Sequence, residues 1–194
     1  MRIFVLCTGR CGSKTFAKAC EHVTNYTAAH ESGRWNRYSL EYPENHIEVD
    51  NRLAWFLGRL DNRYPGAFYV HLLRDEEATT RSYALRAKMP TQIVHGFMFA
   101  IKQGQHGDPA RESREMVATI NANIRHFLRE KPHMTIDIET ADKSFPAFWE
   151  RIRAEGRLDA ALGELKKRHN QSPRRKKERE KALRNSDARR FTPD

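Results

Sequence analysis

The sequence has no apolar run of the length that a membrane span requires. Hydrophobic residues make up 39% of its 194 positions, yet no run approaches the roughly 20 apolar residues of a transmembrane helix. An apolar strand is expected to begin at residue 2, which leaves no room for a signal peptide, transit peptide or N-terminal anchor. The length suits one α/β domain, and no internal repeat is present. We therefore expect a soluble cytoplasmic protein.

Cysteines are also few, and acidic residues are fewer than basic ones. The three cysteines all lie within the first 20 residues, a placement that does not suit a disulfide framework, so we expect reduced thiols. Lys and Arg number 35 against 25 Asp and Glu, a formal net charge of +10. This excess predicts anionic partners, although charge alone does not separate a nucleotide from an acidic glycan, a nucleic acid or a membrane surface.

Most of the positive charge lies near the C-terminus. Between Lys166 and Arg190 there are twelve Lys or Arg residues and three acidic residues. We therefore divide the chain into an α/β domain over residues 1–165 and a basic tail over 166–194. Three interpretations of the tail stay open. It can complete a phosphate site through Arg174 and Arg175, hold an anionic acceptor, membrane or RNA, or remain a solvated segment.

Strand and helix patterns alternate along the chain, with one long loop over residues 31–46. Strands are expected at 2–6, 26–30, 67–73 and 134–138, and helices at 14–22, 50–64, 76–87, 91–103, 111–129, 145–154 and 158–167. This alternation predicts a three-layer α/β fold with a central parallel sheet. In such a fold the ligand lies at the carboxyl ends of the strands.

The first strand leads into a glycine turn and a helix start, with the sequence TGRCGSKT over residues 8–15. Two glycines in this turn allow a ligand to approach the backbone, and amide groups at a helix start favour an anion. We predict a phosphate-binding loop formed by Arg10, Cys11, Gly12, Ser13, Lys14 and Thr15. An ordinary strand, turn and helix with a capping serine is the alternative.

A second basic site follows the strand at 67–73. Arg74 ends that strand and Ser82 lies eight residues later on the next helix, so the two side chains can meet over one phosphate. The alternative is a surface salt bridge from Arg74 to Glu76 or Glu77 and a solvated serine.

With both motifs the chain resembles the PAPS-dependent sulfotransferases, whose donor is 3′-phosphoadenosine 5′-phosphosulfate (PAPS). The resemblance covers residues 2–86. It implies that the glycine loop holds the 5′-phosphosulfate, with Arg10 at the leaving phosphate, and that Arg74 and Ser82 hold the 3′-phosphate. It also implies PAP as the product, no metal, and a small-molecule, glycan or lipid acceptor. The chain departs from the family at Glu76, where a proline is usual, and in lacking a recognisable C-terminal glycine-rich loop.

Sulfuryl transfer requires positive charge at the leaving phosphate and a base for the acceptor proton. Arg10 and Lys14 can supply the charge. His30 and Glu31 follow the second strand, on the edge that carries the glycine loop, and some bacterial sulfotransferases of similar layout use a glutamate at this distance. Glu31 is the first choice for the base. Glu48 and Asp50 are the second, although Asp50 can equally cap a helix, and His30 can be a packed residue at a strand end.

Two other functions stay open. A P-loop kinase or NTPase requires glycines where this chain has Thr8 and Ser13, and a magnesium ligand such as Asp75 or Asp137. A nucleic-acid-binding module would depend on the basic tail.

Overall fold

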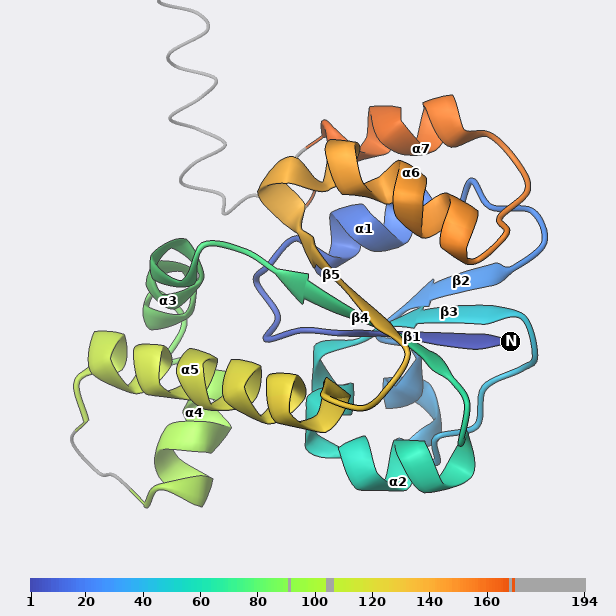
Figure 1. Cartoon of the computed structure of the whole chain (residues 1–194). Coiled ribbons are helices and arrows are strands. Elements are labelled where there is room, and N and C mark those ends of the chain that lie inside the picture. The colour runs from blue at the N-terminus through green and yellow to red at the C-terminus, as the bar shows by residue number, and fades with distance from the viewer. Residues whose placement is uncertain (91, 104–106, 168, 170–194) are drawn as a thin grey trace, which may run out of the picture.

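The computed structural model has the predicted three-layer α/β architecture (Figure 1). It describes residues 1–90, 92–103, 107–167 and 169. All strand pairs in its five-stranded sheet are parallel, and the strand order is β2-β3-β1-β4-β5. The strands are β1 (Arg2–Leu6), β2 (Thr27–His30), β3 (His46–Val49), β4 (Phe68–Leu73) and β5 (His133–Asp137).

Helices cover both faces of the sheet. Figure 1 shows α1, α6 and α7 on one face, with α2 and α5 on the other. The α-helices are α1 (Ser13–Cys20), α2 (Leu57–Arg63), α3 (Glu76–Ala84), α4 (Ile93–Gly96), α5 (Pro109–Leu128), α6 (Ala141–Arg151) and α7 (Leu158–Leu165). Short 3-10 turns are η1 (Ser32–Asn36), η2 (Asn51–Trp55) and η4 (Ile138–Thr140), and η3 (Phe97–Ile101) is π-helical. None of the helices in the described ranges could cross a membrane.

Strand β1 lies at the centre of the sheet and contributes to both hydrophobic layers. Successive side chains of a strand point to opposite faces. Ile3 and Val5 accordingly pack with α1, α6 and α7, whereas Phe4 and Leu6 pack with α2, α3 and α5. All four side chains are fully buried, as expected for a parallel strand covered on both sides.

The sequence prediction missed strand β3 and gave as single helices two segments that the structure divides. Strand β3 contains His46 and Glu48, which are buried although polar, so its sequence does not read as an apolar run. The helix expected at 50–64 is divided at Phe56 into η2 and α2. The segment expected as one helix at 91–103 forms the short α4 and the π-helical turn η3.

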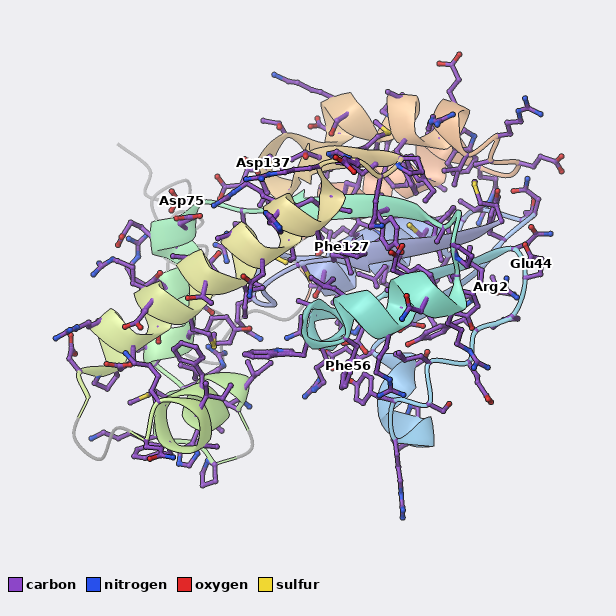
Figure 2. The ribbon with its side chains drawn as sticks, turned by 60° about the horizontal axis from the view of Figure 1, so that its bottom comes forward. Arg2, Glu44, Phe56, Asp75, Phe127 and Asp137 are labelled. Atoms are coloured by element: carbon purple, nitrogen blue, oxygen red, sulfur yellow. The ribbon has the colours of Figure 1, made fainter. Side chains whose placement is uncertain are left out.

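The strand order places the predicted glycine loop after β1 and the second motif after β4 at the same edge of the sheet. The connection after β1 leads to β2 on one side of the sheet, and the connection after β4 leads to β5 on the other. The two therefore leave in opposite directions and open a crevice at the carboxyl edge. Figure 2 shows Asp75 and Asp137, which follow β4 and end β5, together at this edge. Arg2 and Glu44 lie at the opposite edge.

The connection between α6 and α7 is hydrogen-bonded to the segment that follows α1. The Thr24 amide donates to the Glu155 carbonyl at 2.8 Å, and the Arg157 amide donates to the His22 carbonyl at 3.1 Å. Gly156 forms a bridge with Val23 and has a φ angle of +126°. These bonds fix α1, and hence the glycine loop before it, against the C-terminal helices.

We predict that Gly156→Ala destabilises the fold by about 1–3 kcal/mol, because alanine rarely adopts this backbone conformation. An added Cβ atom would also lie 2.2 Å from the His22 carbonyl oxygen. Gly163→Ala is the matched control, since that position lies inside α7 with no neighbour within 4 Å of a new Cβ atom. The control should stabilise the protein by about 0.4–1 kcal/mol. Urea unfolding measures both, and equal stabilities for the two variants would contradict the prediction.

Candidate functional site

A cavity of about 1650 Å³ opens at the carboxyl edge of the sheet. Residues that follow each of the five strands line it. It brings together nine of the ten residues predicted for the site, namely Arg10, Gly12, Ser13, Lys14, Thr15, His30, Glu31, Arg74 and Ser82. The two motifs, separated by some 60 residues in the sequence, therefore border one space.

The glycine loop between β1 and α1 has an unusual backbone. Gly9, Arg10 and Gly12 all have positive φ angles, of 77°, 57° and 85°. Gly9 has no room for a side chain, because a Cβ atom there would lie 2.4 Å from the Tyr83 hydroxyl and 2.5 Å from Asn51 Nδ2. Arg10 adopts a left-handed backbone conformation although it is not a glycine, and strained conformations of this kind cluster at functional sites.

The second motif contacts the glycine loop directly. Arg10 Nε donates to Ser82 Oγ at 3.1 Å, and Arg74 NH1 donates to the Arg10 carbonyl at 3.0 Å. The alternative salt bridge from Arg74 to Glu76 or Glu77 is not formed. Arg74 instead lies 3.7 Å from Glu139, while those two glutamates contact residues of α5.

The buried side chain of Tyr83 holds the glycine loop in place from the core side. Its side chain is fully buried, and its hydroxyl donates to the Thr8 carbonyl. Burial raises the pKa of this phenol well above its usual range, so the group stays protonated and remains a donor. Tyr83 was not singled out by the sequence. In the sequence, only its position directly after Ser82 could have drawn attention to it.

Cys11 is the one predicted site residue that does not line the cavity. Its side chain is buried beside Cys7 in the core. A hydrogen bond with the Cys11 thiol, together with complete burial, raises the pKa of Cys7 well above its usual range. The structure thus uses the Cys11 side chain for packing, and only its backbone belongs to the loop.

The side chains of His30 and Ser13 lie within hydrogen-bond distance at the start of α1. Ser13 Oγ and His30 Nε2 lie 3.1 Å apart, which joins the end of β2 to the first turn of α1. Lys14 is exposed and also lines the cavity. A positive side chain and the amino end of a helix therefore face the same space, which favours an anion.

Glu31 lies at the cavity wall and is paired with Arg52, a residue that the sequence did not single out. Arg52 NH1 is 3.3 Å from Glu31 Oε2, and the glutamate side chain is 25% exposed. Glu31 has a positive φ angle of 54°. Its amide donates to the Val49 carbonyl at 3.1 Å, which fixes this turn to the end of β3.

Glu48 is completely buried beneath Glu31 and does not line the cavity. Its carboxylate accepts from the Ser32 amide at 2.9 Å, from the Ser32 hydroxyl, and from His46 Nε2 at 3.1 Å. A buried charge with every oxygen satisfied is a structural anchor. Glu48 therefore holds the residue next to Glu31 and has no access to a substrate in this structure.

Asp50 has a similar buried position. It accepts from the Arg52 amide at 2.8 Å and from the Tyr38 hydroxyl at 3.1 Å, and it caps η2 as the alternative interpretation required. Burial raises the pKa of Asp50 to about 6. Like Glu48, Asp50 does not line the cavity.

The end of α7 closes another side of the cavity. Lys166, Lys167 and His169 line it, and Thr15 Oγ1 donates to the Lys167 carbonyl at 3.4 Å. The start of the region predicted as a basic tail thus borders the glycine loop. Arg174 and Arg175 lie outside the described residues, so the division into 1–165 and 166–194 stays a prediction.

The two aspartates considered as magnesium ligands are used as caps. Asp75 accepts from the Ala78 amide at the start of α3, and Asp137 accepts from the Glu139 amide at the start of η4. Within the part of the chain that the structure describes, no group of three His, Cys, Asp or Glu side chains is placed to hold a metal ion.

No protein-family model matches the sequence, and no curated protein matches it. Solved structures similar to this one include a sulfotransferase domain from the curacin biosynthetic pathway, at 12% identity and a TM-score of 0.64, over 86% of this chain and 78% of that one. A sulfotransferase from Alicyclobacillus acidocaldarius, at 11% identity and a TM-score of 0.46, covers 91% of this chain and 88% of its own. The chain therefore has the α/β fold of a sulfotransferase domain.

Proposed function

We propose that this protein is a sulfotransferase that moves a sulfuryl group from PAPS to a hydroxyl or amine of an acceptor. The observation that carries the proposal is the meeting of the glycine loop with Arg74 and Ser82 in one cavity. A donor phosphorylated at two positions needs two anion sites on one wall. The fold shared with a sulfotransferase domain supports the same conclusion.

The charge of the cavity suits such a donor. Three acidic side chains line it, against eight Lys or Arg side chains, which are Arg10, Lys14, Arg52, Arg74, Arg81, Arg86, Lys166 and Lys167. Two of the acids are already paired, Glu31 with Arg52 and Glu139 with Arg74. The remaining positive charge favours a ligand with several negative charges.

The size of the cavity allows a second substrate. Pockets for drug-sized ligands measure roughly 300–1,000 Å³, and this one is larger at about 1650 Å³. We propose a small-molecule, glycan or lipid acceptor. The cytoplasm is the proposed compartment, since all three cysteines are buried and free.

In the transfer step, the acceptor oxygen or nitrogen forms a bond to sulfur while the bond from sulfur to the 5′-phosphate oxygen breaks. The electron pair of the broken bond stays on the phosphate. Arg10, Lys14 and the amides at the start of α1 stabilise that charge, and in-line positioning supplies most of the remaining acceleration.

Glu31 takes the acceptor proton in this proposal. It is the carboxylate at the cavity wall on the β2 and β3 side, whereas Glu48 and Asp50 are enclosed. Arg52 and the Glu48–Ser32 contact hold it in place. His30 lies beside Ser13 on the glycine loop and orients the first turn of α1.

We predict that adenosine 3′,5′-bisphosphate stabilises the protein and that ATP with magnesium does not. At a ligand concentration of about 100 Kd the gain is about 2.7 kcal/mol, or roughly 5–10 °C in Tm, for a chain of this size. A thermal-shift assay measures both ligands. Stabilisation by ATP with magnesium alone would favour a kinase, and stabilisation by RNA alone a nucleic-acid-binding module.

The same assay tests the second motif. Arg74→Ala should weaken bisphosphate binding by about tenfold to a hundredfold, because a hydrogen bond to a charged group contributes about 1.5–3 kcal/mol. Arg63→Ala is the control, since Arg63 pairs with Glu41 and lies away from the cavity. Equal affinities for the two variants would contradict the assignment of Arg74.

Glu31→Gln should lower sulfuryl transfer by roughly 10²–10⁴-fold and leave bisphosphate affinity unchanged, because a general base acts on the acceptor proton alone. Transfer from radiolabelled PAPS to a panel of phenols, glycans and hydroxylated lipids measures the rate. Glu41→Gln, an exposed glutamate outside the cavity, serves as the control. A Glu31→Gln variant with full activity would rule out this residue as the base.

A further inference from the structure

The segment over residues 81–103, which is described except for residue 91, leaves several large apolar side chains exposed. It runs from α3 through α4 to η3, on the side of the molecule away from the N-terminus (Figure 1). Seven large hydrophobic side chains are exposed in the described part of the chain, and this segment holds four of them, namely Leu85, Met89, Phe99 and Ile101. Exposed apolar side chains that gather in one region mark an interaction surface.

The inner face of the same segment belongs to the hydrophobic core. Tyr83, Ala87, Val94, Phe97 and Met98 are buried and belong to the cluster that contains residues of β4 and α5. The segment is therefore firmly packed on one face. The exposed apolar side chains do not result from a loosely packed element, and they form a separate, outer face.

The segment also carries positive charge without any acidic residue. Its basic residues are Arg81, Arg86, Lys88 and Lys102, and it contains no Asp or Glu. Two glutamates of α5, at 2.8 and 2.5 Å, neutralise Lys102. Within the described ranges, the other three basic side chains form no ion pair with a carboxylate, and Arg81 and Lys88 are exposed. The exposed apolar side chains are thus accompanied by uncompensated positive charge.

This combination fits the surface of an anionic lipid bilayer. Segments that bind there insert apolar side chains at the boundary between headgroups and acyl chains, and their Lys and Arg side chains attract anionic headgroups. A nucleic acid would match the charge, but it offers no hydrocarbon to the aliphatic side chains of Leu85, Met89 and Ile101. The apolar and the basic residues of the segment are both accounted for only by a partner that has hydrocarbon and negative charge.

A second basic stretch begins across the cavity from this segment. Residues 166–190 contain twelve Lys or Arg and three acidic residues. Lys166 and Lys167, at its start, line the same cavity as Leu85 and Ile93. Positive charge therefore borders the cavity on two sides, which adds to the attraction of an anionic surface.

We propose that the outer face of segment 81–103 docks on an anionic lipid bilayer, with Leu85, Met89, Phe99 and Ile101 in the interface and the basic side chains at the headgroups. The attachment is peripheral, since no helix in the described ranges could cross a membrane. Because Leu85 also lines the cavity, the docked protein presents the cavity at the headgroup layer. This inference goes beyond the proposed function and does not rest on it.

Co-sedimentation of the full chain with vesicles tests the proposal. Vesicles of phosphatidylcholine and phosphatidylglycerol in equal parts are compared with vesicles of phosphatidylcholine alone. We expect binding to the anionic vesicles that weakens as salt is raised, because salt screens exposed charges. Binding to the neutral vesicles should be weaker by at least about tenfold, because each basic residue near an anionic surface contributes about fivefold.

Three variants locate the surface. Leu85→Ser and Ile101→Ser should each weaken binding to the anionic vesicles by about tenfold, because each removes an aliphatic side chain from the interface. Both side chains are more than half exposed, at 74% and 56%, so neither change should alter the fold. Lys88→Gln should weaken binding by about fivefold and reduce its dependence on salt.

Two control variants make the same kinds of change outside the segment. Trp35→Ser removes an apolar side chain that is 79% exposed on η1, and Arg59→Gln removes an exposed positive charge on α2. Both should bind the vesicles with wild-type affinity. Urea unfolding checks that all five variants keep the stability of the wild-type protein.

Several outcomes would overturn the inference. One is equal binding of the wild-type protein to both kinds of vesicle, and another is binding to neither. Loss of affinity in Lys88→Gln, with both serine variants at wild-type affinity, would indicate a purely electrostatic surface such as one for a nucleic acid. These outcomes leave the proposed function intact, because the bisphosphate assay contains no lipid. Conversely, vesicle binding without stabilisation by the bisphosphate would support the surface and contradict the proposed donor.

Discussion

The site depends on the contact between the glycine loop and the β4–α3 unit. The buried Tyr83 hydroxyl donates to the Thr8 carbonyl, and Arg74 donates to the Arg10 carbonyl. Both acceptors are backbone groups of a turn in which three residues have positive φ angles. A turn of this kind persists only where its surroundings determine it. The glycine loop and the Arg74–Ser82 motif are thereby fixed relative to each other by contacts within the protein.

A second set of buried polar contacts, at the end of β3, fixes the wall of the cavity that carries Glu31. Glu48 and Asp50 alternate with apolar residues at the end of β3, and both are fully enclosed. Their hydrogen bonds go to Ser32, Tyr38 and the Arg52 amide, so they hold the turn that carries Glu31 and the arginine paired with it. Charged groups in a core cost free energy unless satisfied. The free-energy cost of burying Glu48 and Asp50 is understandable because the two carboxyl groups hold Glu31 in position.

The sequence was sufficient for the parts of the fold that depend on local pattern. The apolar runs of β1 and β4, and the glycines before α1, predicted the central strands and the loop. Strand β3 could not be predicted in this way, because burial of its polar residues depends on partners outside the strand, Thr27 for His46 and Ser32 for Glu48. Arg86 lies only four residues from Ser82, but its proximity to Arg10 exists only once α3 packs beside the loop.

The conformation of Arg10 links the shape of the loop to the choice of ligand. A glycine turn at a helix start can hold any phosphate. Here Gly9 and Arg10 together turn one basic side chain out of that turn and onto α3, where Arg86 and Arg74 already lie. A nucleotide with phosphate at one end only would leave these like charges without a counter-charge. The donor that we propose, with phosphate at two positions, would supply negative charge that offsets the repulsion in this cluster.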